Sequence, residues 1–308
     1  MNQIQKLAGL TNAIVDLTYQ VSEDDLVGFG LKKGFLNSNE DFDYKQVLKF
    51  LDSKKPLVVS GGSPGNVIRT ASLLGTNTSL FGVVGDDFYG KKYIDDLVNL
   101  GVESFIDVTP GDTGRCYILL TPDGEKTSFV DLGVSYKYSV MRCDLSKMDV
   151  FHTSGYELMT NKLSTLMAVQ KAGDSGALVS FDLADPFIAD SFGKVINYFL
   201  DSVYFLFGTE DEFSAFTGKN PLLAIETLSA HVPVVILKKG KAGSVVRSKD
   251  KVFSFPAEPV KVVNTNGAGD AYAAGFLSAY MNGCDVQSCG RKASVVASKV
   301  CGIEKPYL

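Results

Sequence analysis

The chain has no apolar run near the roughly 18 residues of a membrane span, and its first residues, MNQIQKLAGL, lack the apolar stretch of a signal peptide. Basic residues are scattered and form no five-residue cluster, and the net charge is −5 with a pI near 5.2. Nucleic-acid binding requires a concentrated basic face. We therefore expect a cytoplasmic protein with no membrane and no nucleic acid among its partners.

Cysteine and histidine are also scarce. The cysteines form no CxxC pair, and their odd number argues against a disulfide framework and a zinc site: Cys116, Cys143, Cys284, Cys289 and Cys301. We expect reduced, buried thiols. Neither histidine receives a role: His152 lies on a strand-like segment, where such a residue is usually part of the core, and His231 lies at a predicted helix end before Pro233.

Short apolar segments alternate with helical patterns along the 308 residues. Four segments are predicted to be buried strands: 80–84, 177–183, 203–207 and 234–237. Three stretches are predicted to be helices: 87–100, 161–171 and 221–230. This alternation predicts an α/β protein with a mostly parallel central sheet and helices on both faces.

Two regions break the alternation. Residues 115–120 and 126–132 flank the turn Pro122-Asp123-Gly124 and predict a hairpin. Residues 14–36 are also β-prone and precede a helical pattern near 44–51. We expect a single domain over residues 1–308, with a small β-sheet lid formed by inserts at about 14–36 and 104–132.

The stretch SGGSPGNVIRTASLLG at 60–75 contains GxSxG, the motif around a hydrolase nucleophile. Pro64 follows Ser63 and has no N–H for an oxyanion hole, so the hydrolase interpretation fails. Ser63 is instead predicted to be the N-cap of a helix. Gly61 and Gly62 would let a ligand approach the backbone, and Asn66 offers a donor and an acceptor, which suits hydroxyl groups.

A second glycine cluster, NTNGAGDAYAAGFLSAY, spans 264–280. Gly267, Ala268 and Gly269 open a helix of small residues, whose free N–H groups and dipole form an anion site. Asp270 lies within this site. An aspartate in the first turn of a helix is ordinarily interpreted as a charge that only interacts favourably with the helix dipole. Here, however, Asn264-Thr265-Asn266 precede it. An anion site beside a carboxylate is what phosphoryl transfer to a hydroxyl requires. Neither GxxxxGK(S/T) nor a GxGxxG after a first strand is present.

Together, SGGSPGN and TNGAGDAYAAGF resemble the two signatures of the PfkB, or ribokinase-like, carbohydrate kinase family. Other segments resemble family segments in the expected order: GLTNAIVDLTYQV, FGVVGDDFYGKKYIDDLVNLGV, CYILLTPDGEKTSF, DVFHTSGY, SFDLADPF and VVILKKGKAGSVV. The style is most similar to the branch of adenosine kinases and related sugar kinases. The resemblance implies a ribokinase-like fold and a kinase that uses ATP and Mg²⁺, with a monovalent cation such as K⁺ as a further candidate.

The resemblance also implies roles for single residues. Asp270 matches the catalytic base, and Gly267, Ala268 and Gly269 match the anion hole. Positions that hold sugar hydroxyls match Asn12, Asp16, Gly61, Gly62 and Asn66. Positions near the nucleotide match Lys238, Gly240 and Thr265, and the glutamate of the NxxE element, linked to magnesium and phosphate, matches Glu212.

The sequence departs from the family pattern in three places. Asn264 replaces the usual aspartate, Thr209 replaces the asparagine of NxxE, and Pro64-Gly65 replaces an alanine pair. Asn264 puts the monovalent-cation dependence in doubt, and Thr209 weakens the assignment of magnesium positioning. None of them touches Asp270, so we expect catalysis to survive.

The implied activity is transfer of the ATP γ-phosphoryl group to a hydroxymethyl group of a sugar. One alternative is a nucleoside kinase, with a nucleobase shelf chosen from Phe29, Phe35, Tyr117 and Phe129, although these residues could equally form the core of the lid. A second alternative is a ligand-binding protein that has lost turnover. The expected partner is a small sugar or nucleoside, with a homodimer through the lid as a further candidate.

Overall fold

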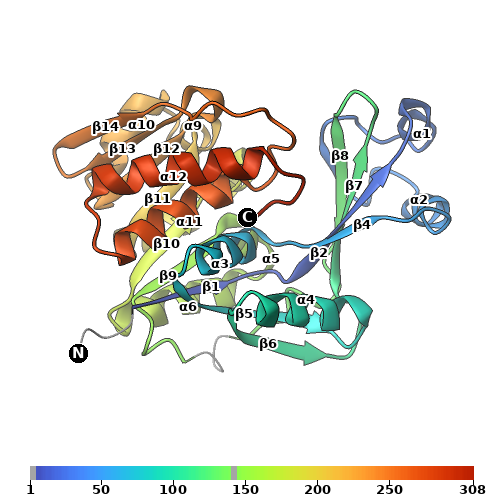
Figure 1. Ribbon diagram of the computed structural model, residues 1–308, viewed down its shortest axis with the longest axis horizontal. Helices are drawn as coiled ribbons and strands as arrows, with labels where there is room; N and C mark the ends of the chain where they lie inside the picture. The colour runs from blue at the N-terminus through green and yellow to red at the C-terminus, as the bar shows by residue number, and fades with distance from the viewer. Residues whose placement is uncertain (1–4, 140–143) are drawn as a thin grey trace.

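The computed structural model describes residues 5–139 and 144–308, so Cys143 lies outside the described residues. A nine-stranded sheet forms the body of the molecule (Figure 1). From edge to edge it consists of β14 (Lys251–Phe255), β13 (Ser244–Ser248), β12 (Val234–Lys238), β11 (Val203–Thr209), β10 (Leu178–Asp182), β9 (Val150–Ser154), β1 (Lys6–Leu10), β5 (Asn77–Gly85) and β6 (Glu103–Thr109). The pairs from β12 to β6 are parallel, and β13 and β14 add antiparallel strands at one edge.

Helices cover both faces of this sheet, as predicted. Their bounds are α3 (Ser63–Leu73), α4 (Phe88–Asn99), α5 (Gly155–Thr160), α6 (Lys162–Asp174), α7 (Pro186–Ser191), α8 (Gly193–Phe199), α9 (Glu210–Thr217), α10 (Pro221–Leu228), α11 (Ala268–Met281) and α12 (Val286–Cys301). Alternate residues of one strand join different cores: Ile236 packs in the core under α3 and α11, while Val235 and Leu237 pack in the core under α6 and α10. Burial on both faces explains the continuous apolar runs that predicted the strands, and the four strands and three helices expected for this sheet are confirmed. The β-prone stretch 14–36 was only partly a strand, because Glu23–Gly28 within it form a helix.

A second, five-stranded sheet stands beside the body (Figure 1). Its order is β3 (Leu36–Asn37), β8 (Lys126–Asp131), β7 (Gly114–Leu120), β2 (Ile14–Gln20) and β4 (Leu57–Ser60), with α1 (Glu23–Gly28) and α2 (Tyr44–Leu51) packed on it. The antiparallel pairing of β7 with β8 confirms the predicted hairpin. The α/β class with a large, mostly parallel sheet and a small second sheet is therefore confirmed.

The boundaries of the small sheet differ from the prediction. Strand β6 pairs with β5 along its whole length, so residues 104–109 belong to the large sheet. Strand β4 joins the small sheet through antiparallel pairing with β2, although no insert was predicted there. Sequence periodicity identifies a strand but not the partner that its backbone hydrogen bonds will find, so β6 was assigned to the wrong sheet.

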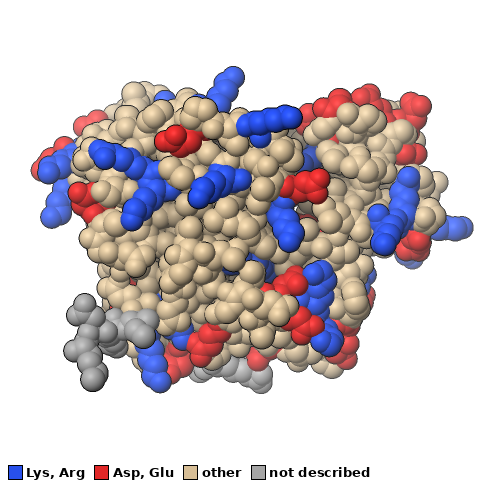
Figure 2. Space-filling view, in the orientation of Figure 1, with Lys and Arg blue, Asp and Glu red and all other residues tan. Residues whose placement is uncertain are grey.

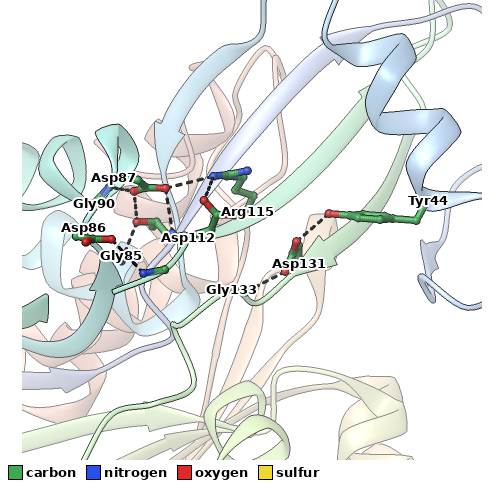
Figure 3. Close-up of polar contacts among 11 residues, drawn as sticks. Tyr44, Gly85, Asp86, Asp87, Gly90, Asp112, Arg115, Asp131 and Gly133 are labelled. Carbon is green, nitrogen blue, oxygen red and sulfur yellow. Dashed lines mark hydrogen bonds and ion pairs between the residues drawn. The ribbon is translucent and has the colours of Figure 1, made fainter. Parts of the chain in front are cut away.

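A polar cluster connects the two sheets (Figure 3). Asp87, the N-cap of α4 two residues after the end of β5, accepts hydrogen bonds from Thr113 Oγ1 (2.5 Å), Thr113 N (3.1 Å) and Arg115 Nη2 (3.2 Å), beside its bond from Gly90 N. A Cβ on Gly85 would lie 2.1 Å from the Gly111 carbonyl oxygen, so the connecting loop packs directly on the end of β5. One carboxylate thus holds the segment that carries the chain from β6 into β7.

Candidate functional site

The two glycine-rich segments meet at the first turns of α3 and α11. Asp270, in the first turn of α11, accepts hydrogen bonds from Ser63 Oγ (2.7 Å, to Oδ1) and from Asn66 Nδ2 (2.9 Å, to Oδ2). Burial raises the pKa of Asp270 to about 6, although both hydrogen bonds oppose this rise. A carboxylate held in this way is ionised at neutral pH and still basic enough to accept a proton.

Ser63 lies one position from its predicted place. The N-cap of α3 is Gly62, with φ 86°, and Ser63 is the first helical residue. Its hydroxyl therefore binds Asp270 instead of capping its own helix. The N-cap prediction was wrong because the Gly61-Gly62 turn places the helix start one residue earlier, a choice made by the packing of the turn against Asn12.

The start of α11 offers free backbone donors. Gly267 has φ 74°, and a Cβ there would lie 2.0 Å from the carbonyl oxygen of Pro306, so only glycine fits. The Ala268 N–H donates to the Thr265 carbonyl over 3.2 Å. Within the described residues, the N–H groups of Gly269 and Asp270 have no such acceptor. These two groups, rather than the Ala268 N–H, are available to an anion.

The predicted hydroxyl-binding residues lie close to this carboxylate. The Oδ1 atom of Asp16, on β2, lies 2.5 Å from the point where a Cβ of Gly61 would be, and the carbonyl oxygen of Asn12 lies 2.5 Å from that of Gly62. The two glycines therefore make room for Asp16 and Asn12. Burial raises the pKa of Asp16 to about 7; Arg69 opposes this rise and Asp270 adds to it. Asp16, Gly61, Gly62 and Asn66 thus form one polar cluster beside Asp270.

Asn12 is held by residues of α5. Its backbone N–H donates to Glu157 Oε1 (2.9 Å), and its Oδ1 accepts from Thr160 Oγ1 (2.9 Å). Glu157 is 1% exposed, and burial raises its pKa to about 7 against hydrogen bonds from Ser154 and Asn12. The sequence analysis did not identify Glu157; a charged residue in an otherwise ordinary short helix carries no local signal of burial.

Lys238 lies at the other side of the α11 N-terminus. Its ammonium group donates to Asp182 Oδ2 over 2.6 Å, and the position of a Cβ on Gly269 lies 3.3 Å from Nζ. Burial alone lowers the pKa of Lys238, but Asp182 and Glu212 outweigh this effect and raise it. A cation is thus kept charged beside the free N–H groups. Asp182 ends β10 and belongs to the SFDLADPF segment, but its contact with Lys238 was not predicted.

The other predicted nucleotide residues lie at the surface. Gly240, with φ 54°, begins a short 3₁₀ turn (Gly240–Ala242) just after β12, and Thr265 precedes the anion site. Both residues are exposed, and Lys238 is the member of this predicted group that faces the α11 N-terminus. The sequence did not predict which of Lys238, Gly240 and Thr265 lies beside the α11 N-terminus.

Glu212 lies in the first turn of α9, where it forms a capping box with Thr209. Its Oε2 accepts from Thr209 N (2.9 Å), and Thr209 Oγ1 accepts from Glu212 N (3.3 Å). Burial raises the pKa of Glu212, and Lys238 opposes this effect. Across residues 5–139 and 144–308, no group of three or more His, Cys, Asp or Glu side chains could hold a metal ion. A magnesium ion here would therefore need ligands from phosphate and water.

Lys126, on β8 of the small sheet, reaches across to the loop before α11. Its ammonium group donates to Asn264 Oδ1, which also accepts from Asn266 N (2.8 Å), while Asn264 Nδ2 donates to the Glu304 carbonyl (2.7 Å). Burial lowers the pKa of Lys126, and the nearby Asp16 opposes this. The sequence analysis missed Lys126, because a lysine after a hairpin turn is ordinarily solvated.

Three of the four candidates for a nucleobase shelf belong to the core of the small sheet, which was the other interpretation of these residues. Phe29 packs on Phe50 (ring centroids 5.1 Å apart), and Tyr117 stacks on Phe129 (4.7 Å), so these three candidates form the packing between the small sheet and its helices. Phe35 is the fourth candidate and is 67% exposed. Their positions follow from strand alternation, which sends Tyr117 and Phe129 away from the face that carries Asp16.

The face that carries Asp16 is small and aliphatic. Across the ladder, Asp16 pairs with Cys116 and Val59, and Cys116 pairs with Val130. Residues paired in this way point to the same side of a sheet. Figure 2 shows positive and negative side chains interspersed over the visible face of the body, with a hollow where body and small sheet meet. In the described part of the chain, no helix is both long and apolar enough to cross a bilayer.

The chain is similar to known proteins in both sequence and structure. The sequence model of pfkB family carbohydrate kinases matches residues 27–306. A nucleoside kinase of Methanothermobacter thermautotrophicus is 32% identical over 77% of this chain and 77% of its own length. An uncharacterized sugar kinase of Archaeoglobus fulgidus is 28% identical over 74% of this chain and 92% of its own. The adenosine kinase from Sinorhizobium meliloti superposes with a TM-score of 0.89 at 25% identity, covering 99% of this chain and 96% of that one.

Proposed function

Because the chain belongs to the pfkB family of carbohydrate kinases, we propose that it transfers the γ-phosphoryl group of ATP to the hydroxymethyl group of a ribose ring, and that this ring belongs to a nucleoside. The observation that carries the proposal is the Asp270 carboxylate, fixed by Ser63 and Asn66 between the Asp16 pocket and the free N–H groups of α11. The nucleoside kinase and adenosine kinase among the similar proteins support a nucleoside as acceptor.

The mechanism follows from the positions of these groups. Asp16 and the Gly61-Gly62 turn hold ring hydroxyls, and the hydroxymethyl oxygen lies against Asp270. Asp270 accepts the hydroxyl proton as the oxygen attacks the γ-phosphorus, and the bond from that phosphorus to the bridging oxygen of ADP breaks. The N–H groups of Gly269 and Asp270 stabilise charge on the transferring group, with Lys238 beside them.

Magnesium would arrive with the nucleotide. Mg²⁺ usually keeps several waters and is bound through phosphate oxygens and one or two carboxylates, which agrees with the absence of a three-carboxylate cluster among the described residues. Glu212 is 5% exposed and lies near Lys238, and it is the carboxylate that we assign to this ion through water. When bound, the ion neutralises phosphate charge.

The small sheet would act as a lid. Lys126, on β8, donates to Asn264 in front of α11. Closure of the small sheet over the acceptor would keep this cation beside the transferring phosphoryl group and exclude water from the site. The hinge is the segment that Asp87 holds between β6 and β7. Closure without an acceptor would be unproductive, so ATP hydrolysis in the absence of acceptor is expected to be slow.

A free sugar is the second candidate acceptor, because the aromatic candidates for a nucleobase shelf pack inside the small sheet instead of facing Asp16. A coupled assay of ADP release over a panel of nucleosides and free sugars distinguishes the two. The highest kcat/KM with a nucleoside supports the proposal, and turnover confined to free sugars replaces it with the second candidate. Tight acceptor binding without ADP release would indicate a non-catalytic binding protein.

A further inference from the structure

The residue behind the acceptor pocket is a buried arginine without a counter-ion. Arg69, on α3, is 0% exposed, and no carboxylate of the described chain lies within ion-pair distance of it. Its Nε and Nη2 atoms have no hydrogen-bond partner among the described residues. A charged group is rarely buried without a partner, because desolvation strongly disfavours it. Such a group needs an explanation beyond packing.

Aromatic rings hold the guanidinium on two sides. Its central carbon lies 4.6 Å from the ring centroid of Tyr93 and 5.3 Å from that of Tyr307. Nη1 donates to the carbonyl of Gly61 over 3.1 Å, and the Tyr93 hydroxyl donates to the same carbonyl over 3.2 Å. The cation is thus fixed directly behind the Gly61-Gly62 turn that lines the acceptor pocket.

Arg69 also determines which way the Asn66 amide points. Nη1 lies 3.4 Å from Asn66 Oδ1, and Asn66 Nδ2 donates to Asp270 Oδ2 over 2.9 Å. A guanidinium has only donors, so it requires the amide oxygen on its own side and leaves the NH₂ group to the carboxylate. A flipped amide would direct its oxygen at Asp270 and repel it.

One departure from the family pattern fits this arrangement. A Cβ on Gly65, where the family usually has alanine, would lie 2.9 Å from Tyr93 Oη and 3.0 Å from Arg69 Nη1. The absence of that side chain is what allows the guanidinium and the tyrosine hydroxyl to meet at the Gly61 carbonyl.

We propose that Arg69 is a positioning residue of this site: its guanidinium orients the Asn66 amide that holds Asp270, and its unpaired charge balances the Asp16 carboxylate on the other side of Gly61. The inference rests on the proposed kinase activity. Titratable groups of positive and negative charge face Asp16 and Asp270 from the surrounding elements. They are Lys126 and Cys116 near Asp16, Asp182, Lys238 and Tyr156 near Asp270, and Tyr93 and Tyr307 beside Arg69. Arg69 and Lys126 both act to lower the pKa of Asp16.

The test compares Arg69→Met with Arg69→Lys and with Leu228→Ala, a core variant on α10 that lies in the other core of the large sheet. Arg69→Met is expected to lower kcat about 10- to 100-fold, because Asp270 loses its oriented partner. Arg69→Lys keeps the charge but not the planar fork, so kcat falls while the pH profile of kcat/KM stays that of the wild type. Leu228→Ala is expected to lower thermal stability with little change in kcat or in the pH profile.

A second measurement does not depend on turnover. Titration of the Asp16 carboxyl by ¹³C NMR is expected to show a midpoint about one unit higher in Arg69→Met than in the wild type, with Arg69→Lys unchanged. Equal midpoints in the wild type and Arg69→Met, or a kcat loss no larger than that of Leu228→Ala, would overturn the proposal. An inactive wild-type enzyme would instead contradict the proposed function, while the titration would still decide the role of Arg69. If Arg69→Met does not fold, the kcat values of Arg69→Lys and Gly65→Ala test the orienting role, and wild-type kcat in both variants would overturn the proposal.

Discussion

Ser63 and Asp270 are separated by 207 positions in the chain, yet the Ser63 hydroxyl donates to Asp270 Oδ1 over 2.7 Å. This contact joins the first turn of α3 to the first turn of α11. It fixes one oxygen of the proposed base, and Asn66 fixes the other. Rotation of the carboxylate is therefore restricted, and its position relative to the anion site is set before an acceptor binds.

The first prediction concerns the base itself. Asp270→Asn keeps the size of the side chain but removes its ability to accept a proton, so kcat is expected to fall about 10²- to 10⁴-fold. The Kd for the acceptor, measured calorimetrically, is expected to change little. Unchanged turnover in a correctly folded variant would exclude Asp270 as the base.

The second prediction concerns pH and stability. Burial raises the pKa of Asp16 to about 7 in the folded protein, against an ordinary value of 3.8, so between these values the folded state binds more protons and stability falls as pH rises. Asp16→Asn removes this loss. Its Tm is expected to exceed that of the wild type at pH 8 by about 2 °C or more, and the difference is expected to vanish as the pH falls to about 4. A difference that is the same at both pH values would show that the Asp16 charge is not the cause.

The third prediction concerns the cation of the lid. Lys126→Met removes the ammonium group that reaches Asn264, and kcat/KM is expected to fall about 10- to 100-fold while Tm changes little. Lys33→Met is the matched control, because Lys33 also lies in the region of the small sheet but pairs with Glu23 and Asp123 at the surface. Equal effects of the two variants would show that lid charge in general, and not the position of Lys126, matters.

The fourth prediction concerns the hinge. Asp87 accepts four hydrogen bonds, and these bonds lower its pKa although burial alone raises it. Asp87→Ala leaves those donors without their acceptor and is expected to lower the free energy of unfolding by about 2–4 kcal/mol. We also expect kcat and KM to change together, because the lid loses its fixed attachment. Urea denaturation measures the free energy of unfolding. If this free energy, kcat and KM all keep their wild-type values, Asp87 does not hold the hinge.

Much of the architecture could be read from local patterns. The alternation of apolar strands with periodic helices predicted the parallel sheet, and the Pro-Asp-Gly turn predicted the β7–β8 hairpin. These features depend on neighbouring residues, whose spacing decides which side chains share a face. The same pattern could not say that β6 pairs with β5 in the large sheet, because that pairing depends on two segments separated in the chain.

The amino-acid sequence by itself determined that a helix follows each glycine-rich segment, because glycine readily adopts the positive φ of Gly62 (86°) and Gly267 (74°) that each helix start uses. Only the tertiary structure decided what each start contacts. It placed Ser63 on Asp270, Arg69 behind Asn66, and Lys126 in front of Asn264. It also turned Tyr117 and Phe129 away from Asp16. Such contacts join segments that lie far apart in the chain, and they form only when the sheets and helices pack on one another.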